Sequence, residues 1–188
     1  MPSRCRFATC LTGVAGLAVL AACGSGGTLA NASIPNTVDT VTLYAVNGTA
    51  IGTPSAYALI GPQIVDVGQS TVFDFAFNID PGPLLLPSGV FQGLQKASGL
   101  QTSSASSFDA LTLAPTDGYA GDRALAISVG TVVLLRSRSQ ICSDGSTFSL
   151  YGKLHVLALD LSARTMQFEV TVDQNCGYRG LAPGLPTQ

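Results

Sequence analysis

The sequence predicts an all-β protein, folded as an antiparallel β-sandwich or a barrel-like structure of about eight to ten strands. Its composition is poor in the helix-forming residues Glu, Lys and Met and rich in Thr, Val and Gly, which favours strands. Short apolar runs recur about every 8–15 residues and are separated by Gly, Pro, Asn and Asp turn signals. Beyond residue 22, no long segment has the 3.6-residue period of an amphipathic helix.

The first expected strand spans residues 38–46 and ends at Asn47-Gly48, a dipeptide typical of two-residue hairpin turns. Residues 49–51 are therefore expected to begin the return strand. Residues 55–60 and 63–67 predict two further short strands, because a Gly-Pro turn signal separates two apolar runs.

Residues 71–79, with the sequence TVFDFAFNI, predict a half-buried strand. Phenylalanines occupy every second position from Phe73 onward, so their rings are expected to face the core. The prolines of the following DPGPLLLPSG segment argue against a regular strand ladder there. Residues 91–96 are expected to form a brief strand or a turn of helix, and residues 97–107 a surface loop.

The C-terminal half contains longer β runs. Residues 108–113 predict a short strand, and residues 123–137 predict either one long strand or two strands divided near Gly130. Residues 147–161 and 164–173 predict a hairpin, since the second run alternates between apolar and polar side chains.

Cys142 and Cys176 are the two cysteines that remain once residues 1–23 are set aside. Cys142 precedes the expected hairpin and Cys176 follows it, so the hairpin brings both to the same end of the sheet. A disulfide between them is therefore expected. Paired cysteines are usually oxidised in exported domains, and the N-terminal segment analysed below predicts export. The alternatives are two buried free thiols, or a metal site that would need further ligands close by.

His155 is the only histidine of the chain, and the hairpin leaves its position open. A hairpin loop with an odd number of residues places His155 opposite Glu169 on the outer face of the sheet. A loop with an even number places it among Met166, Phe168 and Val170 on the core face. The two outcomes differ because a shift of one residue exchanges the faces of a strand.

The N-terminal segment has the three-part layout of a secretory signal peptide. Arg4 and Arg6 form a short positive region, an uncharged stretch of mainly Ala, Leu, Val and Gly follows, and small residues end it. The apolar stretch is shorter than the roughly 20 residues that a membrane-spanning helix needs. Residues 1–22 are therefore expected to be removed by cleavage.

Leu20-Ala21-Ala22-Cys23 resembles the lipobox of bacterial lipoproteins. The resemblance implies that Cys23 receives a diacylglycerol, that the chain is cut before Cys23, and that the new amino group is acylated. Acyl chains would then hold the protein on a membrane of the cell envelope. The outer membrane is favoured if the organism has two, since Gly24 stands where an Asp would favour inner-membrane retention. An ordinary secreted protein or an uncleaved membrane helix are the alternatives.

The expected organisation is a signal peptide (1–22), the lipidated Cys and a flexible tether (23–36), a single β-rich domain (37–180) and an irregular tail (181–188). Without the two signal-peptide arginines, seven basic and 11 acidic residues give the mature chain a formal net charge of −4. A nucleic-acid-binding domain is expected to carry a basic patch. The composition therefore argues against a nucleic-acid partner.

No catalytic or metal-binding constellation stands out in the sequence. A Ser-His-Asp or Cys-His enzyme would have to use His155, and there is no G-x-S-x-G motif. Acidic turns at Asp80, at residues 117–122 and at Asp144 suggest calcium only weakly, because Asp-Gly is ordinary turn chemistry and no EF-hand loop is present. We predict no catalytic residue, no cofactor and no metal ligand.

Arg136 and Arg138 are expected on one face of a strand end. They could meet a lipid phosphate or a sugar acid. The preferred interpretation is a solvated, charged edge that discourages aggregation between sheets.

The sequence therefore favours a non-enzymatic envelope module that binds a partner protein, a glycan or another envelope component, or that has a structural role. One alternative is a hydrolase of envelope polymers, which needs a cleft with converging Asp residues or with His155. The other is a small-molecule carrier, which needs an apolar cavity lined by the phenylalanines of residues 73–77.

Overall fold

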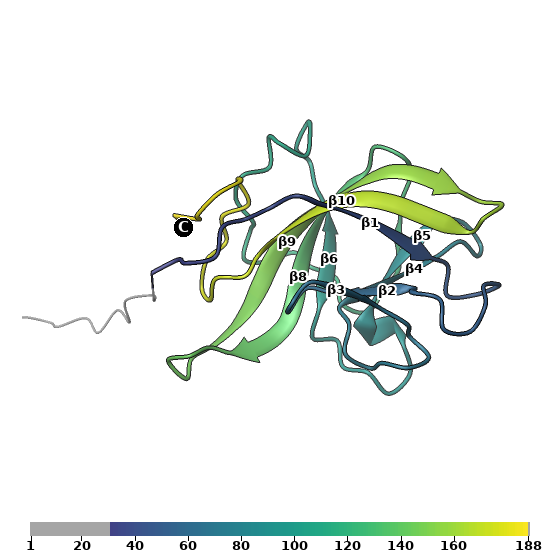
Figure 1. Ribbon diagram of the computed structural model, residues 1–188, viewed down its shortest axis with the longest axis horizontal. Helices are drawn as coiled ribbons and strands as arrows, with labels where there is room; N and C mark the ends of the chain where they lie inside the picture. The colour runs from purple at the N-terminus through teal and green to yellow at the C-terminus, as the bar shows by residue number, and fades with distance from the viewer. Residues whose placement is uncertain (1–30, 188) are drawn as a thin grey trace, which may run out of the picture.

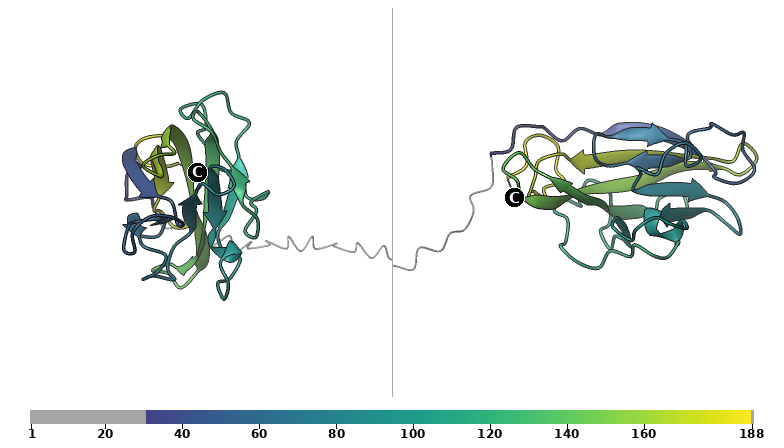
Figure 2. Two further views of the ribbon diagram at one scale, coloured as in Figure 1. Left: turned by 90° about the vertical axis from the view of Figure 1, so that its right-hand side faces the viewer. Right: turned by 90° about the horizontal axis from the view of Figure 1, so that it is seen from below.

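Two antiparallel sheets of five strands each pack face to face in the computed structural model, which describes residues 31–187 (Figures 1 and 2). In the first sheet the strand order is β1 (Asp39–Tyr44), β10 (Thr165–Asp173), β9 (Thr147–Asp160), β8 (Val132–Ile141) and β6 (Gly99–Thr102). In the second sheet the order is β3 (Gln63–Val65), β2 (Ala56–Ala58), β4 (Phe75–Asn78), β5 (Leu84–Pro87) and β7 (Leu125–Ala126). A single 3-10 turn, η1 (Ser88–Val90), follows β5. The all-β prediction is confirmed, and the architecture is a sandwich.

The core lies between the sheets and is built on aromatic rings. Phe168 of β10 packs its ring edge-on against Tyr57 of β2 and Phe75 of β4, with ring centroids 5.9 and 6.0 Å apart. Phe75 and Phe77 are fully buried in this core, as their alternation predicts. Burying each large apolar side chain contributes about 1.5–3 kcal/mol, so this contact between the sheets is a main source of stability.

The β4 region differs from the prediction of a half-buried strand, because both of its faces are covered. Ala76 and Phe73 belong to a second apolar cluster on the outer side of the second sheet, where Phe91 and Leu94 pack against them. Phe73 therefore does not share the face of Phe75. Phe91 and Leu94 come from the loop after β5, and Val46, Val65 and Val67 from segments before β4 complete the cover. The local pattern of residues 71–79 cannot predict where these segments lie.

The prediction that prolines prevent a ladder after residue 79 is wrong. Pro81 and Pro83 precede β5, and Pro87 is its last residue, so the interior of the strand keeps its N–H donors. The predicted surface loop at 97–107 contains β6, an edge strand that pairs with β8. Gly99 of β6 lies so close to Tyr119 that an added Cβ would be 2.7 Å from the Cβ atom of that residue.

Two strands predicted from local signals do not form. Gly48 adopts a left-handed turn conformation (φ 74°), but residues 49–51 form no strand, because β1 pairs with β10 and the next strand, β2, belongs to the other sheet. Residues 108–113 form turns over the outer face of the first sheet. The predicted division near Gly130 is confirmed, with Gly130 at φ 86° just before β8.

The β9–β10 hairpin has an even, four-residue loop, since Asp160 pairs with Thr165. Loop parity alone would place His155 on the core face. A β-bulge at Leu157 adds one residue to β9 and shifts the register, so that His155 pairs with Glu169 on the outer face. The number of residues in the hairpin loop therefore does not by itself predict the face on which His155 lies.

Cys142 and Cys176 form the expected disulfide, with their Cα atoms 6.1 Å apart. It lies beside the start of the described chain, because Cys176 and Ser143 line one cavity with Asn31, Ser33 and Ile34. In Figure 1 the N-terminal and C-terminal ends of the described chain lie at the same end of the sandwich. Asn175 holds the N-terminal side there, accepting hydrogen bonds from the N–H groups of Ser33 and Ile34 at 2.8 and 3.0 Å. The segment expected as a tether is thus fixed to the sandwich from Ser33 onward. Residues 1–22 and Cys23 lie outside the described residues.

The expected tail is irregular but packs closely on the domain. Asn36 and Gly184 exchange two backbone hydrogen bonds, at 2.8 and 3.1 Å. Leu181 is fully buried with Leu134 on the outer face of the first sheet. The folded unit therefore includes residues on both sides of the predicted domain boundaries.

Candidate functional site

The candidate site begins with a β-bulge in β8. Arg136 pairs with Tyr151 and Ser139 with Ser149, so Ser137 and Arg138 together oppose the single residue Leu150. The hydroxyl of Ser137 accepts a hydrogen bond from the N–H of Leu150 at 2.7 Å, in place of a normal ladder bond. The N–H of Arg138 has left the ladder and needs another acceptor.

Asp74, which precedes β4 in the other sheet, supplies that acceptor. Its carboxylate accepts hydrogen bonds from the N–H of Arg138 at 2.8 Å, from Nη1 of Arg138 at 3.1 Å and from the N–H of Leu59 at 2.7 Å. The Asp74 side chain is only 1% exposed, whereas that of Arg138 is 26% exposed. Asp74 therefore links the two sheets. It also fixes the guanidinium of Arg138, which lies between the buried carboxylate and the solvent.

The electrostatics of this pair follow from burial. Desolvation raises the pKa of Asp74 above its ordinary value, while the three hydrogen bonds and the charge of Arg138 act in the opposite direction. Removing the guanidinium would leave a buried carboxylate with two backbone donors and no counter-charge. The ion pair is thus a matched unit in which neither partner is dispensable.

A cleft of about 410 Å³ opens beside this pair. Its lining combines one cation, several hydroxyl and amide groups, and apolar side chains. The lining residues are Thr71, Phe73, Ser88, Leu94, Gln95, Ala97, Arg138 and Ser139. This volume lies within the range of about 300–1,000 Å³ that small-molecule sites occupy.

One wall of the cleft is the loop between β5 and β6, and both ends of this loop are fastened to Asp74. The N–H of Ser88 and the hydroxyl of Ser98 both donate to the backbone carbonyl of Asp74, at 3.0 and 2.7 Å. The two serine hydroxyls lie 2.8 Å apart. Phe91 packs edge-on against Phe73 with ring centroids 5.1 Å apart. These contacts shape the cleft without a ligand.

The prediction that Arg136 and Arg138 share a face is wrong. The guanidinium of Arg136 lies 5.3 Å from the ring centroid of Tyr119, on the outer face of the first sheet. Arg138 instead reaches Asp74 beside the second sheet. The bulge between them interrupts the alternation of side chains, which a count along the strand assumes to be unbroken.

His155 belongs to a separate polar cluster on the outer face of the first sheet. Its Nδ1 lies 2.7 Å from Oε1 of Glu169, and its ring stacks on Phe108. Beside it, Lys153 is 1% exposed, and its ammonium donates to the carbonyls of Phe108 and Leu111 at 2.8 and 3.0 Å. Burial lowers the pKa of Lys153. These contacts fasten the 108–113 loop onto the sheet.

The acidic turns considered for calcium are used for other contacts. Asp80 pairs with Arg164 at 2.7 Å, and Asp122 with Lys96 at 3.0 Å. Asp144 accepts hydrogen bonds within its own turn, from Ser146. Within residues 31–187, no three His, Cys, Asp or Glu side chains are grouped as a metal site would need.

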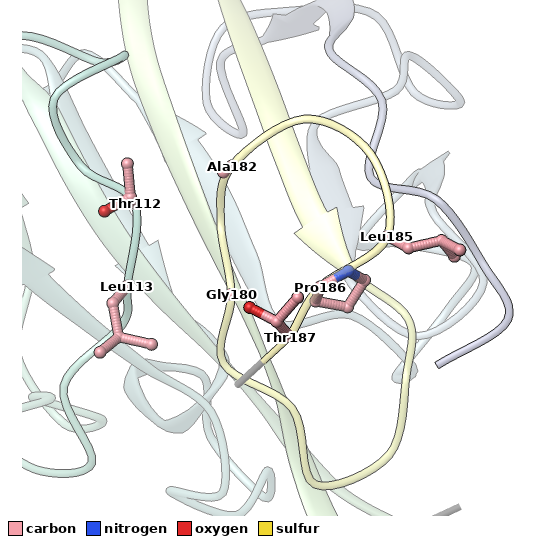
Figure 3. Close-up of a pocket in the computed structure, with 7 residues that line it drawn as sticks. All are labelled: Thr112, Leu113, Gly180, Ala182, Leu185, Pro186 and Thr187. Carbon is pink, nitrogen blue, oxygen red and sulfur yellow. The ribbon is translucent and has the colours of Figure 1, made fainter. Parts of the chain in front are cut away.

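A second cavity, of about 260 Å³, lies between residues 112–113 and the C-terminal segment (Figure 3). All of its lining residues are uncharged: Thr112, Leu113, Gly180, Ala182, Leu185, Pro186 and Thr187. It therefore offers less specific chemistry than the cleft beside Arg138.

Sequence reasoning did not identify Asp74 or Lys153 as important. Asp74 stands between alternating phenylalanines in residues 71–79, and Lys153 stands within the long β run of residues 147–161, so neither position attracts attention in the sequence. The usable signal is a charged residue in the interior of a strongly apolar strand segment, because a buried charge needs a dedicated partner.

No family of known proteins matches this sequence, and neither does any curated protein. Within the described part of the chain, the structure has no helix of the length and hydrophobicity that a bilayer crossing requires.

Proposed function

We propose that the chain is a membrane-anchored bacterial envelope lipoprotein whose β-sandwich is a non-catalytic binding or structural module. The main support for a membrane anchor is the sequence Leu20-Ala21-Ala22-Cys23, which follows a charged and then an apolar N-terminal segment. The Cys142–Cys176 disulfide supports export, because disulfides persist in oxidising compartments and are rare in the cytosol.

The position of the N-terminal segment fits this proposal. Ser33 and Ile34 are held beside Asn175, close to the disulfide. The eight residue steps from Cys23 to Asn31 can span at most about 28 Å when fully extended. The end of the sandwich that carries the disulfide would therefore lie nearest the membrane.

A binding role draws its support from the cleft beside Arg138, which combines a fixed cation with several hydroxyl and amide groups. The carrier alternative has less support, since Phe75 and Phe77 are fully buried against other core side chains. A hydrolase would have to use Asp74, which is occupied by three hydrogen bonds, or His155, which is paired with Glu169 outside the cleft.

Membrane fractionation of cells that express the full chain tests the anchor. We expect the wild-type protein in the membrane fraction and the Cys23→Ser variant in the soluble fraction or retained as uncleaved precursor. The double variant Cys142→Ser/Cys176→Ser is the matched control, because it removes two cysteines and keeps the lipid acceptor. A Cys23→Ser protein that fractionates and is processed as the wild type does would overturn the proposal.

A further inference from the structure

We infer that the cleft beside Asp74 and Arg138 binds a sugar that carries a carboxylate group, which sits on the guanidinium of Arg138. This inference rests on the proposed function in so far as it treats the sandwich as a binding module. It names the ligand class and the residue that recognises it.

The first support is the arrangement of the two charges. Asp74 is buried behind Arg138, and the guanidinium lines the cleft with about a quarter of its side chain exposed. Asp74 bonds both the backbone N–H and Nη1 of Arg138, so the position of the guanidinium is fixed before any ligand arrives. A guanidinium has five N–H donors, of which Asp74 engages one. The donors that remain are suited to a carboxylate, which arginine binds in a two-pronged geometry.

The second support is the number of cations. Arg138 is the one charged residue among those that line the cleft. A phosphate group carries more charge and is usually held by several basic groups or by a row of backbone N–H donors. A single arginine matches a single negative charge, so a carboxylate fits better than a phosphate.

The third support is the rest of the lining. Thr71, Ser139 and Gln95 offer hydroxyl and amide groups, and Phe73 and Leu94 add apolar surface. A sugar ring has the same mixture of hydroxyl groups on its edges and apolar C–H groups on its faces. The volume of about 410 Å³ admits a ligand of one or two sugar rings.

Calorimetric titration of the full-length protein in detergent with glucuronate tests this inference. We expect saturable binding of glucuronate and at least about tenfold weaker binding of glucose, which lacks the carboxylate. Arg138→Lys keeps the charge but loses the two-pronged geometry, and it should weaken glucuronate binding about tenfold. Arg123→Lys is the matched control on an exposed arginine outside the cleft, and it should leave the affinity unchanged.

Ser139→Leu provides a second variant, because it fills the cleft from an exposed position and leaves the Asp74–Arg138 pair intact. It should abolish glucuronate binding without lowering the melting temperature. Three outcomes would overturn the inference: no glucuronate binding, equal affinity for glucose, or equal affinity for acetate. Failure of the anchor would be distinguishable, since it would appear as absent acylation at Cys23 in a protein that still binds glucuronate.

Discussion

The carboxylate of Asp74 accepts a hydrogen bond from the backbone N–H of Arg138 at 2.8 Å, although the two residues are 64 positions apart in the chain. The donor is available because a bulge removes Arg138 from its ladder, and the acceptor is buried beside the opposite sheet. A local irregularity in β8 thus becomes a link between the sheets. The same link fixes the guanidinium that lines the cleft.

Replacing Asp74 with Ala should destabilise the protein by about 3 kcal/mol, because it leaves the N–H groups of Leu59 and Arg138 without acceptors and a half-buried guanidinium without its partner. Asp74→Asn keeps one oxygen acceptor and should cost less. Urea denaturation monitored by circular dichroism measures both. Asp122→Asn, at the exposed Lys96 pair, is the control and should leave the urea midpoint unchanged. Equal midpoints for Asp74→Ala and wild type would contradict the structural role of this link.

Gly152 in the middle of β9 should not accept a methyl group. An added Cβ would lie 2.7 Å from the carbonyl oxygen of Thr171 and 3.3 Å from the side chain of Val172. The backbone of β10 would have to move, so we expect Gly152→Ala to destabilise the protein by about 1–3 kcal/mol. Gly82→Ala is the matched control, because nothing lies within 4 Å of its added Cβ. Similar melting temperatures for the two variants would show that β10 can move away from position 152 at little cost in stability.

Removing the disulfide should destabilise the protein by about 4 kcal/mol, because the unfolded chain regains the entropy that a cross-linked loop of this length loses. The double variant Cys142→Ser/Cys176→Ser, compared with wild type in urea, measures the effect. Reductant should lower the urea midpoint of the wild type and leave that of the double variant unchanged. A wild type that is insensitive to reductant under unfolding conditions would contradict the bond.

The burial of Lys153 predicts a dependence of stability on pH. Its pKa is lowered from 10.5 in the folded state, so between the lowered pKa and 10.5 the unfolded chain binds more protons. The free energy of unfolding contributed by this group therefore rises with pH across that window. The pKa of Tyr57 is raised to about 12, which acts in the opposite direction only above about pH 10.

Urea denaturation of wild type and Lys153→Met between pH 8 and pH 10.5 isolates this effect, because the range reaches the ordinary pKa of 10.5 and all other titratable groups are shared. The stability of the wild type relative to Lys153→Met should increase with pH. A difference between the two proteins that stays constant over this range would indicate that Lys153 titrates in the folded state as it does in the unfolded chain.

The features that sequence reasoning predicted correctly depend on short stretches of chain. The disulfide follows from one hairpin flanked by two cysteines, and the break before β8 follows from a glycine that adopts positive φ. The inward position of Phe75 and Phe77 follows from alternation within one strand. Each of these inferences needs only local pattern and composition.

The features that it missed depend on contacts between distant segments. The bulges at Leu157 and at Ser137–Arg138 become visible only when two strands are paired, and each moves side chains to another position or face. β5 and β6 form strands because β4 and β8 pair with them. The prolines around β5 and the polar residues around β6 locally disfavour a strand. The cleft depends on both effects, so sequence patterns could not predict it.

The chemical state of Cys23 distinguishes a lipoprotein from an ordinary secreted protein most directly. Mass spectrometry of the N-terminal peptide, from protein purified out of the membrane fraction, measures that state. We predict a mature chain that begins at Cys23 and carries the added mass of a diacylglyceryl group, with or without a further acyl chain on its amino group. A mature chain that begins elsewhere, or an unmodified Cys23, would contradict the proposed lipoprotein.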